Sequence, residues 1–193
     1  MSTDLLQFLA ERGHSPECTD AAGLLAATSK GIVTGYCGFD PTADSLHIGS
    51  MTQLMLLRRL QKAGHRPIAL VGGATGRIGD PSFRDESRPV MSDEQIALNI
   101  AGIKGDISKF LTFGTGPTDA ILVNNADWLD KIGYIELLRE VGTHFTINRM
   151  LTMESVKLRL EREHPMTFLE FNYMIMQGYD FVELKKRYDC SLQ

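Results

Sequence analysis

The sequence predicts an α/β protein built on a Rossmann-like parallel sheet with helices on both faces, of which the first half is present. Short apolar runs at 32–39, 68–71 and 120–123 have strand character and alternate with longer segments of helical periodicity. The connections after the first two runs are rich in glycine and polar residues. Proteins of this class bind phosphates at such strand ends, so the connections also predict a ligand site.

Composition limits the classes to which the protein can belong. With 193 residues, 43% hydrophobic and 23% charged, the chain can bury one full core. The net charge of -4 argues against a globally basic nucleic-acid binder. No apolar run approaches the ~20 residues of a membrane span. Scattered Cys18, Cys37 and Cys190 lack metal-ligand spacing, and the N-terminus lacks a signal-peptide pattern, so we expect a reduced, cytoplasmic protein with no protein-bound metal.

The elements follow in order along the chain. Residues 1–31 are predicted to form a helical arm, in which Asp20 caps a second short helix. The 51–60 run is apolar on most sides, which predicts a helix packed between two layers, and Ala63-Gly64 ends it. Ser92 is predicted to cap the next helix, which extends to about Phe113.

The last third of the sequence changes character near Gly133, where strands give way to helices as far as Tyr188. The run 190–193 has the pattern of a new strand. Because a doubly wound sheet binds nucleotides between two βαβ halves, we expect residues 32–193 to be the first part of a larger domain.

Several polar features are expected to meet in one crevice. In the run 36–50 a strand leads through Asp40-Pro41-Thr42 to His47, which opens a helix. Alone, this is either a phosphate-binding turn or an ordinary connection with a surface histidine. Tyr173, Gln177 and Asp180 share one helix face, either as a binding stripe or as a solvated face. The others are the glycine loop ending at Asp80, the basic residues Arg84 and Arg88, and Asn124-Asn125.

Four stretches carry a resemblance to a known family: CGFDPTADSLHIG at 37–49, AGHRPIALVGGATGRIGDPS at 63–82, NNADW at 124–128, and the segment 173–181. The chain resembles the N-terminal part of the catalytic domain of bacterial tyrosyl-tRNA synthetases, which are class I aminoacyl-tRNA synthetases. The resemblance implies a tyrosine–tRNA ligase that activates L-tyrosine with ATP, forming tyrosyl adenylate and pyrophosphate. The tyrosyl group then passes to the 3′ end of tRNA(Tyr).

The resemblance also implies a role for each matching residue. Tyr36 and Asp180 would bind the substrate phenol, and Asp80, Tyr173 and Gln177 its ammonium group. ATP and the adenylate would contact Cys37, Gly38, Asp40, His47, Gly49 and Ser50. The implied catalytic residues are Thr42 and His47 on the γ-phosphate side, with Arg84 and Arg88 neutralising the pyrophosphate. Mg²⁺ would accompany ATP without a tightly binding protein site.

The sequence departs from the family pattern in two ways. Ser50 stands where the signature has a second histidine. The chain also ends before the family's Ser-Asp-Gln-Trp segment, its KMSKS-type loop and its anticodon-binding region, so we expect the isolated 193 residues to be inactive. An alternative is a non-catalytic relic that binds tyrosine, nucleotide or RNA.

The helical segment at about 133–165 corresponds to the family's dimerisation insertion, which implies a homodimer. Its apolar residues form either a dimer patch or an internal core, and its basic residues either contact tRNA or form a solvated face. The apolar set is Phe145, Ile147, Met150, Leu151 and Met153, and the basic set is Arg149, Lys157, Arg159 and Arg162.

Overall fold

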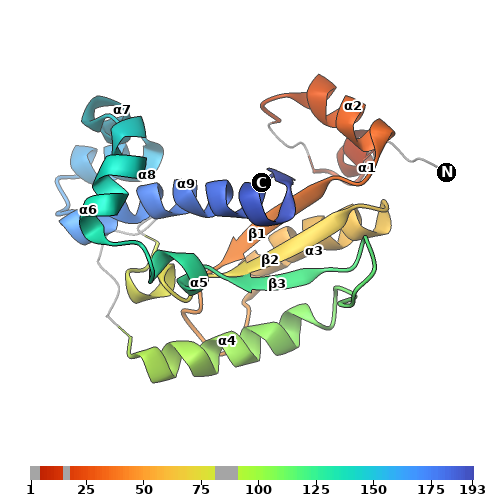
Figure 1. Ribbon diagram of the computed structural model, residues 1–193, viewed down its shortest axis with the longest axis horizontal. Coiled ribbons are helices and arrows are strands. Elements are labelled where there is room, and N and C mark those ends of the chain that lie inside the picture. Colours follow the sequence, from red (N-terminus) through yellow and green to blue (C-terminus); the bar gives the residue numbers. More distant parts are fainter. Residues whose placement is uncertain (1–4, 15–17, 81–90) are drawn as a thin grey trace.

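A four-stranded parallel sheet forms the centre of the computed structural model, which describes residues 5–14, 18–80 and 91–193 (Figure 1). The strands are β1 (Thr34–Phe39), β2 (Arg66–Val71), β3 (Ile121–Asn124) and β4 (Cys190–Leu192). Their order is β3-β2-β1-β4, and each neighbouring pair is parallel. The predicted fold class is confirmed, and so is the strand expected at 190–193. Because β1 lies between β2 and β4, the strand order reverses beside β1, where doubly wound sheets bind ligands.

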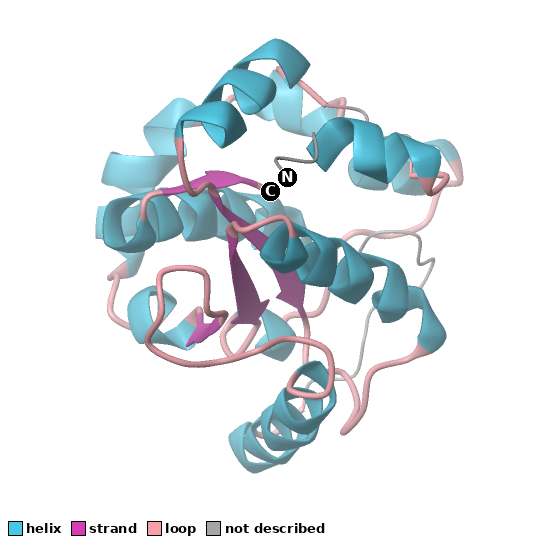
Figure 2. Cartoon of the chain, turned by 90° about the vertical axis from the view of Figure 1, so that its right-hand side faces the viewer, coloured by secondary structure: helices cyan, strands magenta, loops and turns pink. Residues whose placement is uncertain are grey.

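Helices cover both faces of the sheet (Figures 1 and 2). Strand side chains alternate between the faces, as the period of two requires. Phe39, Ala69 and Val71 pack with α3 (Ile48–Lys62) and α4 (Asp93–Ile107). On the other face, Ile68 and Leu70 pack with Trp128 of α5 (Ala126–Leu129) and Leu184 of α9 (Phe168–Tyr188).

The N-terminal segment forms helices α1 (Leu5–Glu11) and α2 (Ala21–Lys30). Leu5 and Leu9 pack against Leu60 of α3, which attaches the arm to the core. Asp20 caps α2, since its Oδ1 accepts the N–H of Gly23 at 2.8 Å, and this prediction is confirmed. Across the described ranges, no helix is both long and apolar enough to cross a membrane.

The helical segment before α9 contains α6 (Tyr134–Glu136), a π-helical turn η2 (Leu137–Val141), a 3₁₀ turn η3 (Gly142–His144), α7 (Ile147–Leu151) and α8 (Glu154–Glu161). Arg159 does not belong to the predicted basic face, because it is only 2% exposed. Its guanidinium forms a buried ion pair with Glu170 at 2.5 Å, which joins α8 to α9. Glu170 also completes the capping box of α9 with Thr167.

Helix α4 begins after its predicted cap, because Ser92 Oγ accepts the N–H of Gln95 at 3.3 Å. It ends at Ile107, however, and not near Phe113. Gln61 of α3 provides a physical reason, since its side chain both accepts from the Thr112 N–H at 3.0 Å and donates to the Thr112 carbonyl at 2.7 Å. These two bonds, with the one from the Ala120 N–H to the Thr112 carbonyl at 2.8 Å, hold the backbone at Thr112 outside a helix.

Candidate active site

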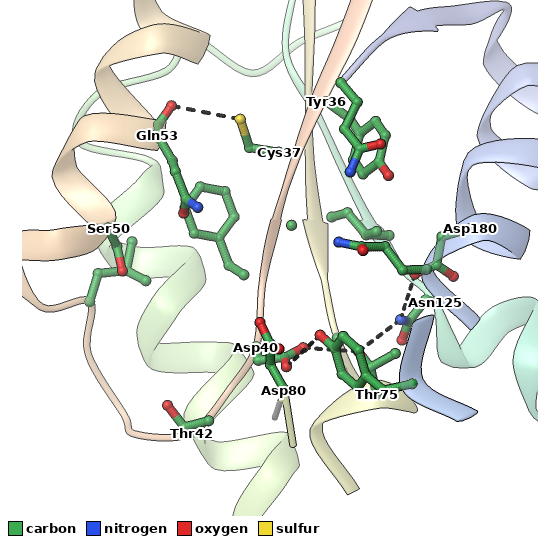
Figure 3. Close-up of a pocket in the computed structure, with 18 of the residues that line it drawn as sticks. Tyr36, Cys37, Asp40, Thr42, Ser50, Gln53, Thr75, Asp80, Asn125 and Asp180 are labelled. Atoms are coloured by element: carbon green, nitrogen blue, oxygen red, sulfur yellow. Dashed lines mark hydrogen bonds between the residues drawn. The ribbon is translucent and has the colours of Figure 1, made fainter. Parts of the chain in front are cut away.

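The carboxyl ends of the strands open into a cavity of about 750 Å³ (Figure 3). Its walls come from β1, the 40–47 loop, the start of α3, the loop after β2, Asn125 and one face of α9. Of the predicted pair Asn124-Asn125 only Asn125 lines this cavity, but every described residue to which the resemblance assigns a role does so. These are Tyr36, Cys37, Gly38, Asp40, Thr42, His47, Gly49, Ser50, Asp80, Tyr173, Gln177 and Asp180. Arg84 and Arg88 lie outside the described residues, and the individual roles of all these residues stay predictions.

The side chains of Tyr36 and Asp180 reach the cavity from two different elements, β1 and α9 respectively (Figure 3). The Tyr36 hydroxyl is buried and has no hydrogen-bond partner among the described residues. The Asp180 carboxylate accepts from Asn125 Nδ2 at 3.1 Å and from Trp128 Nε1 at 2.7 Å. Burial raises the pKa of Asp180 to about 6, and these two hydrogen bonds oppose the rise. Asp180 is therefore ionised at neutral pH and keeps acceptor capacity for a further donor.

A chain of hydrogen bonds runs from Asp180 to the far wall of the cavity. Asn125 Nδ2 also donates to Thr75 Oγ1 at 3.0 Å, and the Thr75 hydroxyl donates to Asp40 Oδ1 at 2.9 Å. The Tyr173 hydroxyl donates to the other Asp40 oxygen at 2.8 Å. Burial, together with the charges of Asp40 and Asp80, raises the pKa of Tyr173 far above its ordinary value. The Tyr173 oxygen thus keeps its proton toward Asp40 and offers its lone pairs to the cavity.

His47 is the N-cap of α3. Its Nδ1 accepts the N–H of Gly49 at 3.0 Å, so the neutral ring carries its proton on Nε2. A Cβ at position 49 would come within 2.9 Å of this imidazole, so a larger residue there would displace the capping ring. The N–H groups of Gly49 and Ser50 are thus both paired with His47, and the positive end of the helix dipole lies at this end of the cavity.

Cys37 and Ser50 lie on the same side of the cavity, on β1 and α3 (Figure 3). The Cys37 thiol contacts the backbone carbonyl of Gln53 at 3.9 Å, and burial raises the pKa of Cys37 to about 11. Cys37 is therefore a neutral thiol at physiological pH. Gln53 also lines the cavity and was not predicted. Its position one helical turn after Gly49, on the same face of α3, was the sequence signal that could have identified it.

Thr75 was also missed, although it belongs to the glycine loop that the sequence singled out. It is 3% exposed and joins Asn125 to Asp40, a role that no local pattern reveals. Taken together, the carboxylates of Asp40, Asp80 and Asp180 line the cavity, and the N-terminus of α3 lies at one end of it. This arrangement suits a ligand with a cationic and hydroxylic part at one end and an anionic part at the other.

Comparison with known proteins agrees with this geometry. The sequence model of the family described as "tRNA synthetases class I (W and Y)" matches residues 28–192. The chain is 60% identical to the tyrosine–tRNA ligase of Novosphingobium aromaticivorans over 192 residues, covering 100% of this chain and 47% of that protein. It is 58% identical to the tyrosine–tRNA ligase of Rhodospirillum rubrum over 191 residues, covering 99% of this chain and 46% of that protein.

A solved structure is also similar, that of a C-terminally truncated mitochondrial tyrosyl-tRNA synthetase from Aspergillus nidulans. It superposes with a TM-score of 0.83 at 31% identity, over 95% of this chain and 54% of that one. The chain thus spans about half the length of the curated relatives that it matches. From the extent of the family match and the fold, the chain belongs to the class I tRNA synthetases of the tryptophan and tyrosine family.

Proposed function

We propose that this chain is the N-terminal part of a tyrosine–tRNA ligase and forms most of its tyrosine-activating site. The observation that carries the proposal is that the unpartnered Tyr36 hydroxyl and the ionised Asp180 carboxylate, both buried, line the same cavity. A phenol placed there can donate to Asp180 and accept from Tyr36, which satisfies both groups. Phenylalanine would leave both groups without a hydrogen-bond partner. Sites built to hydrogen-bond a hydroxyl strongly reject analogues that lack it, and discrimination between tyrosine and phenylalanine by tyrosyl-tRNA synthetases is itself the known example of this rule.

The ammonium group of tyrosine would lie near Asp80, Tyr173 and Gln177, which line the same cavity. Asp80 supplies the opposite charge. Because the Tyr173 proton is already directed to Asp40, its oxygen is oriented as an acceptor for an ammonium N–H. Gln177, one turn farther along α9, would orient its carbonyl oxygen in the same way.

ATP would lie over Cys37, Gly38, Asp40, Gly49 and Ser50, with its phosphates at the N-terminus of α3. The tyrosine carboxylate, ionised at neutral pH, attacks the α-phosphorus. An O–P bond forms, the bond to the bridging oxygen breaks, and pyrophosphate leaves without a proton transfer. Thr42 and the Nε2–H of His47 would donate to the phosphates, and Arg84 and Arg88 would neutralise the leaving pyrophosphate. Mg²⁺ bound to the ATP phosphates would supply further charge neutralisation.

The transfer of the tyrosyl group to tRNA is proposed from the names of the relatives. The homodimer is proposed from apolar residues exposed on the helical segment. The whole protein would transfer the tyrosyl group to tRNA(Tyr) in the cytoplasm. In the apolar set of the helical segment, Met150 is buried in the core, whereas Ile147 and Leu151 are 60% and 42% exposed. These two residues and the exposed Phe168 fit a homodimer contact, in agreement with the family resemblance.

The test is exchange of label between pyrophosphate and ATP, measured on the full-length protein with each amino acid in turn. Tyrosine should drive the exchange, and exchange driven by tryptophan instead would contradict the proposal. Calorimetry with tyrosine, Mg·ATP and an acceptor-stem duplex addresses the non-catalytic alternative. Binding of RNA without binding of tyrosine would favour that alternative.

A further inference from the structure

One face of helix α4 lies directly against the loop 40–47, which connects β1 to α3 (Figure 1). Asn99 Nδ2 donates to the Pro41 carbonyl at 2.8 Å. One turn on, the backbone of Gly102 packs so closely against the Asp44 carbonyl oxygen that a Cβ at position 102 would overlap it. After another turn, Asp106 Oδ2 accepts the Leu46 N–H at 3.0 Å. These three positions recur at helical spacing and contact the loop along its length.

The contact at Asn99 is the most buried of the three. Asn99 is 2% exposed, and its Oδ1 accepts from Gln95 Nε2 at 2.9 Å, which fixes the amide orientation so that Nδ2 faces Pro41. Pro41 is itself fully buried, and on its other side a Cβ at Gly76 would approach its ring to 2.9 Å. Without Asn99, the Pro41 carbonyl would lose a donor in a place where water does not reach it readily.

We propose that Asn99 is a positioning residue for the nucleotide, acting through the loop 40–47; this inference rests on the proposed function. The loop places Thr42 and His47 on the cavity wall, where the phosphates of ATP are proposed to lie. The groups proposed to bind the phenol, Tyr36 and Asp180, come from β1 and α9, and α4 does not supply them. Asp40 is held separately by Thr75 and Tyr173. Replacing Asn99 should therefore weaken the binding of ATP and leave the binding of tyrosine unchanged.

The experiment measures two ligands on the full-length protein and on its Asn99→Ala variant, well below the unfolding temperature of each. The KM for ATP in tyrosine-dependent exchange should rise about five- to twentyfold, because a buried carbonyl loses its partner and the loop shifts. The Kd for tyrosine, measured by calorimetry without ATP, should stay within about twofold. Leu98→Ala is the matched control, since Leu98 neighbours Asn99 on α4 and is 66% exposed. It should change neither constant.

A second variant keeps the test decisive if Asn99→Ala does not fold. Asp106→Ala removes the acceptor for the Leu46 N–H at the other end of the loop and should raise the KM for ATP in the same direction, by about two- to fivefold. An unchanged KM for ATP, or an equal loss of tyrosine affinity, would overturn the positioning role. If the wild type itself shows no tyrosine-dependent exchange, the proposed function fails. Calorimetry of Mg·ATP with wild type and variants then decides the positioning role separately, because it requires only nucleotide binding.

Discussion

The indole Nε1–H of Trp128 donates a 2.7 Å hydrogen bond to Oδ1 of Asp180 from behind the cavity wall. Burial raises the pKa of Asp180, and this bond and the one from Asn125 limit the raised value to about 6. The two donors therefore keep the carboxylate ionised at neutral pH. Trp128 is 4% exposed and does not itself line the cavity, so its effect on a ligand passes through Asp180.

Replacing Trp128 with phenylalanine should raise the pKa of Asp180 above 6, because the ionised form loses a donor. Tyrosine affinity should fall at pH 7, and the midpoint of its pH profile should move upward. The measurement is calorimetric tyrosine binding between pH 5 and 8. Arg187→Ala is the control, since Arg187 lies over the Trp128 ring at 5.1 Å without touching Asp180. A weaker affinity with an unmoved midpoint would contradict this account.

The pKa of Asp180 also predicts a pH dependence for the unaltered protein. Below pH 6 the protonated carboxyl no longer offers both oxygens as acceptors, so tyrosine should bind about tenfold more weakly at pH 5 than at pH 7.5. The effect on stability has the opposite sign. A pKa raised on folding stabilises the folded state below the unfolded value of about 4, and this contribution is lost as pH rises through about 6.

Urea unfolding can detect that loss. Relative to Asp180→Ala, the wild-type protein should lose on the order of 2–3 kcal/mol of unfolding free energy between pH 4 and pH 8. A constant difference between the two proteins across this range would show that Asp180 titrates at an ordinary pKa. The comparison with the variant removes the contribution of the other acidic groups.

Tyr36→Phe should separate binding from stability. The Tyr36 hydroxyl is buried without a partner in the described structure, so its removal should leave the unfolding free energy unchanged or raise it slightly. Tyrosine affinity should fall about five- to twentyfold, while phenylalanine affinity should not fall. A large destabilisation in a thermal melt would indicate that the hydroxyl has a structural partner in solution.

Two substitutions of His47 distinguish its cap from its proposed phosphate contact. Asparagine is a strong N-cap residue, so His47→Asn should keep the stability of the protein, whereas His47→Ala should cost about 1 kcal/mol in urea unfolding. Both variants should slow pyrophosphate exchange by a similar factor, because both lack the Nε2–H donor. Full exchange activity in His47→Asn would restrict the role of His47 to the helix cap.

Removing one partner of the buried ion pair between Arg159 and Glu170 should lower the free energy of unfolding strongly. Arg159→Met leaves the Glu170 charge buried, and we expect a loss of about 3–5 kcal/mol in unfolding free energy. Adding Glu170→Gln should recover part of that loss, because glutamine removes the charge and still serves the capping box with Thr167. Additive losses in the double variant would show that the two side chains do not depend on each other.

Much of the fold was predictable because its signals are local. The apolar runs around Ile68 and Val123 and the caps at Asp20 and Ser92 depend on near neighbours in sequence. The end of α4 and the burial of Arg159 were not predictable, since each depends on a partner on another element, Gln61 and Glu170 respectively. The same division holds in the site. The lining residues with an assigned role followed from the family motifs, whereas Gln53 and the bonds that Thr75 and Trp128 make did not.

The pairing of β1 with β4 has a consequence for how the molecule is made. Thr34 aligns with Cys190, almost at the opposite end of the chain, and Asp180 reaches the cavity from the helix just before that strand. During synthesis, Tyr36 therefore leaves the ribosome long before the wall that faces it exists. Contacts between such distant residues form slowly, because a long loop must close before they are gained. The early chain consequently presents one edge of β1 with its backbone N–H and C=O groups unpaired until residues 190–192 have been made.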